Sequence, residues 1–166
     1  MKRNVLKGLV VGLVGGLAAS WTMDRFQEVW FALATPDQGS DDANEAQQQS
    51  DENATVQAGA AISETLFRHS LTPREKKLAG AAVHYAVGAT AGMVYGVTAE
   101  FLPEVTVCFG TAFGTAFWLT VDEGAVPLLG LAKGPTEYPL STHVYAFASH
   151  LVFGATVEGV RRLMRP

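Results

Sequence analysis

The stretch Trp118-Leu-Thr-Val-Asp-Glu-Gly-Ala-Val-Pro-Leu-Leu-Gly-Leu131 carries an apolar helix to its end and places two carboxylates, Asp122 and Glu123, at the boundary. Pro127 and Gly130 then favour a turn, because proline interrupts a helix and glycine readily ends one. A second apolar segment with two histidines follows this turn. The pattern predicts a polar site at one end of a bundle of membrane-spanning helices.

The composition indicates a small membrane protein. Hydrophobic residues make up 48% of the 166 residues and charged residues 17%, below the roughly 25% of a soluble domain. Glycine is abundant, with 17 residues, as in closely packed transmembrane helices. No basic face is interleaved with aromatic residues, which argues against a nucleic-acid partner. The single cysteine, Cys108, lies in an apolar run and excludes a disulfide framework or a cysteine-based metal site.

Four apolar segments are long enough to be spanning helices: residues 8–33, 78–101, 105–121 and 140–160. The second of them extends a helix that begins with a capping-box pattern of Thr72, Pro73 and Glu75. From Pro73 to Phe101 this helix would measure about 43 Å at 1.5 Å per residue, enough to cross a hydrocarbon core of roughly 30 Å. Pro103 then ends it. We therefore predict an all-α fold, a four-helix transmembrane bundle.

The chain divides into three parts. Residues 1–34 are expected to form the first spanning helix, residues 35–72 an acidic loop with a short surface helix, and residues 73–166 three further spanning helices. Residues 36–57 contain six acids and no Lys or Arg, so we expect a loosely held loop there. The surface helix is expected from Ala58 to His69. A cleaved signal peptide is the alternative for the N-terminus, because a basic start and an apolar run precede Ala18-Ala19-Ser20.

Small residues recur at intervals of four along the predicted helices, which places them on one ridge of each helix. Such ridges allow two helix backbones to approach closely. We predict helix packing at Gly8, Gly12, Gly16, Gly80, Gly88, Gly92, Gly96, Gly110 and Gly114.

Four spans place both termini on the same side of the membrane. The basic group before the first helix usually sets the orientation, and a long acidic loop is easily exported. The sequence therefore predicts a bacterial inner-membrane protein with both termini in the cytoplasm.

Ionisable residues gather at the end of the bundle opposite the termini. Helices one and three leave the terminal side and helices two and four return to it, so late positions in the first pair meet early positions in the second. Charges within spans are costly and usually serve a function. The candidate polar site contains His84, Asp122, Glu123, His143 and His150, with Asp24 and Glu28 as secondary candidates. Each has a structural alternative: the acids can pair with Arg25 or interfacial water, and the histidines can pack against a neighbouring helix.

Three chemistries could use this set. Imidazole and carboxylate groups at His84, Asp122 and His150 suit a divalent metal ion. The same groups could form a proton relay, because histidine titrates near neutral pH. Two histidines on facing helices could ligate haem, although no attachment motif is present. The sequence contains no nucleophile motif, phosphate loop or dinucleotide fingerprint, so a non-enzymatic role is favoured.

Several short motifs occur in a fixed order in the second half of the chain: Val94-Tyr95-Gly96, Ala99-Glu-Phe-Leu-Pro103, Pro127-Leu-Leu-Gly-Leu131, Tyr138-Pro139, and Ser149-His-Leu-Val152 followed by Glu158 and Arg161-Arg162. In these motifs the chain resembles the YagU-type family of bacterial inner-membrane proteins. The resemblance implies a multi-pass inner-membrane protein with a link to acid resistance. It implies no catalytic residues.

We therefore expect a multi-pass protein of the lipid bilayer that responds to protons or metal ions and supports tolerance of envelope or acid stress. One alternative is a membrane-embedded metal- or haem-binding protein or enzyme. The other is a structural subunit that assembles through its glycine ridges, as a homo-oligomer or in a membrane complex.

Overall fold

The structure is a computed structural model that describes residues 4–34 and 54–165. This part of the chain is helical and contains no strand, which confirms the predicted all-α class. The longest helices are α1 (Val5–Ala34), α4 (Pro73–Phe101) and α7 (Leu140–Met164). Shorter helices are α3 (Ala54–Ile62), α5 (Thr111–Thr120) and α6 (Val126–Leu128). Two π-helical turns, η1 (Ser63–Phe67) and η3 (Val121–Ala125), and two 3₁₀ segments, η2 (Pro103–Gly110) and η4 (Pro135–Glu137), connect them.

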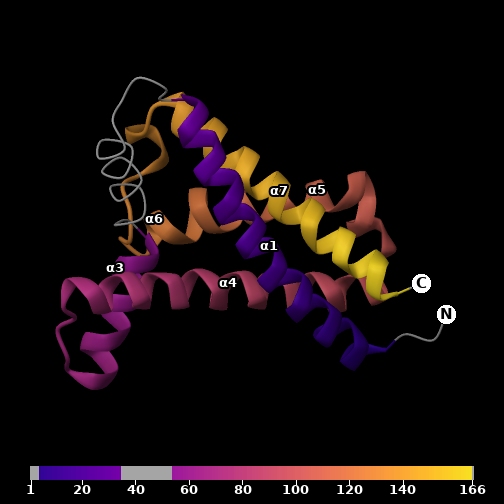
Figure 1. The fold of residues 1–166 in the computed structure, drawn as a ribbon, viewed down its shortest axis with the longest axis horizontal. Helices are drawn as coiled ribbons and strands as arrows, with labels where there is room; N and C mark the ends of the chain where they lie inside the picture. The colour runs from indigo at the N-terminus through magenta and orange to yellow at the C-terminus, as the bar shows by residue number, and fades with distance from the viewer. Residues whose placement is uncertain (1–3, 35–53, 166) are drawn as a thin grey trace.

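The long helix α1 packs against both α4 and α7, and α7 packs in turn against α5. α4 and α7 touch each other at few points. The beginning of α1 and the end of α7 lie at the same end of the molecule, and α3 and α6 lie at the opposite end (Figure 1). α1 crosses the middle of α4, and the last turns of α1 lie beside the first turns of α7 (Figure 1).

Glycines allow α1 and α4 to approach until their backbones touch. Gly8, Gly12 and Gly16 lie against the carbonyl groups of Gly96, Gly92 and Gly88, in antiparallel order. A Cβ atom at Gly12 or Gly92 would collide with the backbone of the opposite helix. Small residues at such crossings permit van der Waals packing that a larger side chain would prevent. We call these six residues the glycine seam.

A second close contact joins α5 to α7. Gly110 and Gly154 lie against each other's carbonyl groups, and Gly114 lies against the carbonyl of His150. Gly154 was not among the predicted packing residues. Another predicted residue, Gly80, packs against Val56 of α3.

The third helix begins later than predicted, at Thr111 rather than Val105. The reason is a run of three left-handed residues, Cys108, Phe109 and Gly110, with φ angles of 54°, 55° and 80°. This conformation ends η2, because it cannot continue a right-handed helix, and only glycine adopts it without steric cost.

The C-terminal end of the third helical segment also differs from the prediction. Helical structure continues past the two carboxylates through η3 and through Pro127 to Leu128 in α6. Pro127 is the second residue of α6 and comes directly after the π-turn of η3. Gly130, with φ 68°, then makes the expected turn.

The start of α4 confirms the predicted capping box. The backbone N–H of Glu75 donates to the Thr72 hydroxyl, and the Thr72 N–H donates to the Glu75 carboxylate at 2.8 Å. Pro73 occupies the first turn, where a backbone N–H has no partner within the helix, so the missing N–H of proline costs no hydrogen bond. The Thr72 hydroxyl, which also donates to Glu75 at 2.7 Å, lowers the pKa of this carboxyl from its ordinary value.

The short helix before α4 starts earlier than predicted. α3 begins at Ala54 rather than Ala58, so residues 54–57 belong to a helix and not to the loop. It packs against the first turns of α4, where a Cβ at Gly59 would meet the Ala79 side chain at 2.8 Å. The rest of the predicted acidic loop, residues 35–53, lies outside the described residues.

Two of the described helical segments are long and apolar enough to cross a membrane, Val5–Leu33 and Pro103–Leu128. Side chains such as Leu13 and Leu17 on α1 and Leu119 on α5 are exposed. These features fit a membrane protein. α4 and α7 do not meet the same criterion of length and hydropathy, so the four-span arrangement stays a prediction.

Candidate functional site

Three histidine–carboxylate pairs lie at the end of the molecule opposite the termini, and each pair joins two different helical segments. Asp24 of α1 faces His84 of α4, Asp122 of η3 faces His150 of α7, and Glu123 of η3 faces His143 of α7. The His84 ring also lies within electrostatic reach of Asp122. We call these six residues the polar site.

The pair between α1 and α4 includes a tyrosine that the sequence analysis did not single out. The His84 Nε2 atom lies 3.1 Å from Asp24 Oδ1, and the Tyr85 hydroxyl donates to Asp24 Oδ2 at 2.9 Å. Asp24 is thus held by two consecutive residues of α4. The sequence signal for Tyr85 is its position beside His84, one turn before the glycine seam begins.

His150 is the most buried histidine of the polar site, with 5% of its surface exposed. Its Nδ1 atom lies 2.8 Å from the Ala146 carbonyl oxygen and 3.7 Å from Asp122 Oδ2. A carbonyl oxygen can only accept, so Nδ1 carries a hydrogen and donates it to Ala146. The contact of the ring with Asp122 is therefore electrostatic and is not a hydrogen bond.

Both ring nitrogens of His143 face oxygen atoms. Nδ1 lies 2.7 Å from Glu123 Oε1, and Nε2 lies 2.9 Å from the Pro135 carbonyl oxygen. A neutral imidazole has one N–H and could donate to only one of these oxygens. The geometry is satisfied when the ring is doubly protonated, or when Glu123 carries a proton and donates it to Nδ1. In either case the pair holds one proton more than a neutral histidine and an ionised carboxylate.

The π-helical turn η3 explains how two adjacent carboxylates serve two histidines. Asp122 and Glu123 are neighbours in sequence, whereas His143 and His150 lie seven residues apart on α7, about 10 Å along the helix axis. A π-turn widens the helix by one residue and is frequent at functional sites. The helix continues into α6 after this turn, so the two carboxylates lie within the helical segment and not at its end.

Glu28 does not join the polar site. Its carboxylate lies 2.6 Å from the guanidinium of Arg25, and both side chains are about half exposed. This is the structural alternative considered for the acids of the first helix, and it applies to Glu28 and not to Asp24.

The metal hypothesis for His84, Asp122 and His150 gains no support from the geometry. Within residues 4–34 and 54–165, no group of three or more His, Cys, Asp or Glu side chains is arranged to hold a metal ion. The closest contacts in the polar site are pairs of one carboxylate with one imidazole. Pairs of this kind are suited to holding and releasing protons.

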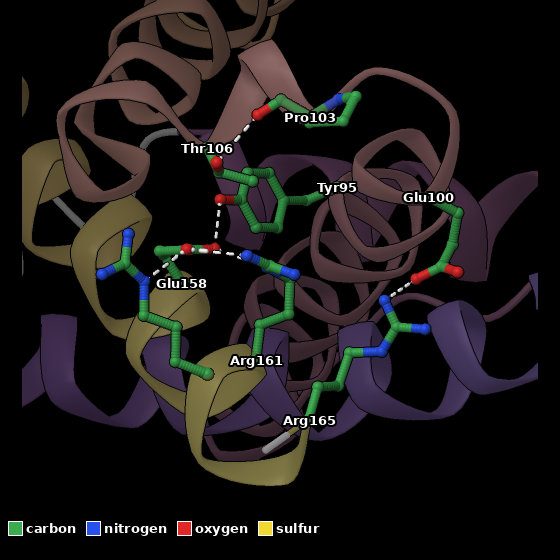
Figure 2. Close-up of polar contacts among 8 residues, drawn as sticks. Tyr95, Glu100, Pro103, Thr106, Glu158, Arg161 and Arg165 are labelled. Atoms are coloured by element: carbon green, nitrogen blue, oxygen red, sulfur yellow. Dashed lines mark hydrogen bonds and ion pairs between the residues drawn. The ribbon is translucent and has the colours of Figure 1, made fainter. Parts of the chain in front are cut away.

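A second polar cluster lies at the end of the molecule that carries the termini (Figure 2). The Glu158 side chain is fully buried and accepts hydrogen bonds from the Tyr95 hydroxyl at 2.7 Å, from Arg161 Nε at 2.6 Å and from Arg162 Nε at 2.7 Å. Glu100 forms an ion pair with Arg165, and both side chains are almost completely buried. We call the cluster Tyr95, Glu100, Glu158, Arg161, Arg162 and Arg165 the terminal network.

The sequence analysis did not predict the terminal network as a buried unit. A signal was present, because His150, Gly154 and Glu158 follow at intervals of four and so share one face of α7. This face packs against the second close contact through Gly154. Glu158 therefore lies inside the molecule, and its charge requires the two arginines that follow it.

Aromatic side chains lie between the two polar clusters, and one of them, Tyr95, also belongs to the terminal network. Tyr95, Phe113, Phe117 and Phe153 form a connected layer, with ring centroids 4.8 Å apart for Tyr95 and Phe113 and 5.2 Å apart for Phe117 and Phe153. The His150 ring packs edge-on against Phe117 on the side of the polar site. These aromatic residues do not form a continuous chain of polar groups between the two ends of the molecule.

A sequence model of the family described as "Protein of unknown function (DUF1440)" matches residues 40–159. The chain belongs to this family. The matched region contains five of the six polar-site residues, and α1, with Asp24, lies before it. No curated protein sequence and no solved structure is similar enough to the chain to count as a match.

Proposed function

We propose that the chain is a multi-pass membrane protein whose polar site responds to protons. The observation that carries this proposal is the His143 ring, whose two nitrogens both face oxygen atoms, so that its pair with Glu123 retains an extra proton. Loss of this proton places a nitrogen lone pair against an oxygen lone pair and weakens the link between η3 and α7.

The pair of His84 and Asp24 acts in the same direction. A histidine that gains its second proton beside an ionised carboxylate forms an ion pair with it. Acidification from neutral pH would therefore tighten the contact of α1 with α4 at this pair. Tolerance of acid or envelope stress is a physiological setting in which such a response would be useful.

A histidine that gains a partner on folding contributes stability below its pKa and loses this contribution as the pH rises. We therefore expect the midpoint of thermal unfolding in detergent to be higher near pH 5.5 than near pH 8, on either side of the histidine range. His143→Asn should remove much of this difference, because an amide does not titrate.

The matched control is His69→Asn. His69 lies outside the polar site and its side chain is more than half exposed beside Glu75. This variant should keep most of the pH dependence of the wild type. An equal pH dependence in the wild type and in His143→Asn would refute the proposed role of the polar site.

We further propose that both termini lie in the cytoplasm and that the four long helical segments span the inner membrane. The terminal network supports this orientation, because it adds Arg161, Arg162 and Arg165 to the basic residues at the start of the chain. A reporter fused to the C-terminus should be active on the cytoplasmic side. A reporter active only outside the cytoplasm would reverse the orientation.

A further inference from the structure

Among the described residues, three arginines at the C-terminal end of α7 face only two carboxylates. Arg165 pairs with Glu100, and both side chains are almost completely buried. Arg161 and Arg162 share the carboxylate of Glu158. We propose that the remaining positive charge, on Arg162, binds the phosphate group of an anionic membrane phospholipid; this inference rests on the proposed membrane location.

The buried carboxylate of Glu158 is already matched by Arg161 alone. Arg161 Nε donates to Glu158 Oε2 at 2.6 Å, and Arg161 Nη2 donates to Glu158 Oε1 at 2.9 Å, so both oxygens accept from one guanidinium. Arg162 adds a second positive charge beside the same carboxylate. No other carboxylate within residues 4–34 and 54–165 forms an ion pair with Arg162. The cluster therefore has a surplus positive charge that an external anion can balance.

The outer edge of the Arg162 guanidinium presents two nitrogen atoms side by side. Its Nε donates to Glu158 Oε1 at 2.7 Å, whereas Nη1 and Nη2 have no acceptor in the described part of the chain. The N–H groups of these two atoms form a planar fork that matches two oxygens of a phosphate. The Arg162 side chain is 55% exposed, so a ligand can reach this fork.

The Arg162 guanidinium is held in place before any ligand binds. Glu158 fixes its Nε edge, and its Cζ atom lies 4.6 Å from the centre of the Phe109 ring. Phe109 has a left-handed backbone with φ 55°, which is unfavourable for a residue with a side chain and requires compensating contacts. The stacking of its ring on the cation is one such contact. An arginine fixed in this way loses less conformational freedom on binding than a free surface arginine.

The surroundings of Arg162 favour a lipid phosphate over a phosphate ion in solution. Leu163, the next residue, is 83% exposed, and Val107 of η2 is 54% exposed. Apolar side chains that reach the surface beside an arginine are typical of the boundary between hydrocarbon and headgroups. Under the proposed orientation this boundary belongs to the cytoplasmic leaflet, whose anionic lipids attract basic residues.

Native mass spectrometry of the full chain in detergent, with phosphatidylglycerol added, tests the inference. We expect one phosphatidylglycerol molecule to bind each chain more tightly than phosphatidylcholine does. Arg162→Gln should weaken this binding about tenfold or more, because a charge-assisted bidentate contact is lost. Arg162→Lys keeps the charge but not the fork, so it should weaken binding less.

The matched control is Arg25→Gln. The Arg25 side chain is 52% exposed, close to the value for Arg162, but its charge is balanced by Glu28. This variant should bind phosphatidylglycerol as the wild type does. Phe109→Leu is a second test that leaves every charge in place, and it should weaken binding several-fold because the ring beneath the guanidinium is lost.

The unfolding midpoint of Arg162→Gln should stay near that of the wild type, since Arg161 still faces Glu158. Equal binding of phosphatidylglycerol to the wild type and to folded Arg162→Gln would overturn the inference, and so would equal binding in Phe109→Leu. Displacement of the lipid by inorganic phosphate would overturn it in favour of a site for free phosphate. These outcomes leave the pH response of His143 untouched. Recovery of the wild-type chain in soluble form without detergent would instead refute the membrane location.

Discussion

The two polar clusters of this molecule use carboxylates in opposite ways. In the polar site each carboxylate faces a histidine, and the pairs other than that of His150 remain about one-fifth to one-third exposed on both partners. In the terminal network Glu158 and Glu100 face arginines, and both carboxylates are buried. Arginine stays charged at all accessible pH values, whereas histidine changes charge near neutrality.

This difference assigns different roles to the two ends. The terminal network joins α4 to α7 through carboxylates that face arginines, and these arginines do not lose their charge near neutral pH. Under the proposed function, the polar site at the other end of the same helices contributes an interaction that depends on pH.

Both polar clusters depend on the same packing of α1 on α4 at the glycine seam. Gly92→Leu should disrupt this packing, because the leucine side chain would collide with the α1 backbone at Gly12 and Gly16. We expect the largest effect of all here, with little or no folded protein recovered from membranes. Gly159→Ala is the control, since the nearest atom to its Cβ is a Phe109 ring carbon at 3.8 Å; it should be tolerated. Normal amounts of folded Gly92→Leu would disprove the role of the glycine seam.

The terminal network should respond strongly to loss of its buried carboxylate. Glu158→Ala leaves the Tyr95 hydroxyl and two guanidinium groups without their acceptor, and breaking a buried ion pair costs about 3 kcal/mol or more. Chemical unfolding should show this loss at neutral and at mildly acidic pH alike. Glu104→Gln, at an exposed carboxylate of η2, should have little effect. A loss that appeared at only one of the two pH values would contradict the proposed difference between the ends.

The polar site should respond more weakly, and its response should depend on pH. Asp24→Asn keeps the size of the side chain but removes the charge that faces His84 and Tyr85. We expect a loss of about 1 kcal/mol at mildly acidic pH, as for a partly exposed hydrogen bond to a charged group, and less near pH 8. Unfolding measured at both pH values checks this. A loss of stability that is the same at both pH values would show that Asp24 acts as a permanent charge, as the carboxylates of the terminal network do.

The smallest effect is expected outside both clusters. Glu28→Gln removes an exposed pair with Arg25, and such surface pairs contribute about 0.5 kcal/mol or less. The unfolding midpoint should hardly change at any pH. A change as large as that of Asp24→Asn would show that Glu28 belongs to the polar site.

The sequence by itself determined the all-α class and the end of the molecule at which the histidines and carboxylates of the polar site lie. Thr72, Pro73 and Glu75 define the start of α4 through local hydrogen bonds, and such local chemistry can be read from a few residues. Hydrophobic runs and chain direction place His84, Asp122 and His150 at a common end. Glycines at intervals of four predict which face of a helix can approach another.

Only the tertiary structure decided which groups meet. Asp24 pairs with His84 whereas Glu28 turns to Arg25, although both lie one turn apart on α1. The left-handed run at Cys108 and Phe109 and the π-turn at Asp122 have no local sequence signal. The run ends at Gly110, which packs against Gly154 of α7, a residue 44 positions away in the sequence. The partner of a charge depends on distances across helices, and these are fixed by backbone contacts between residues far apart in sequence.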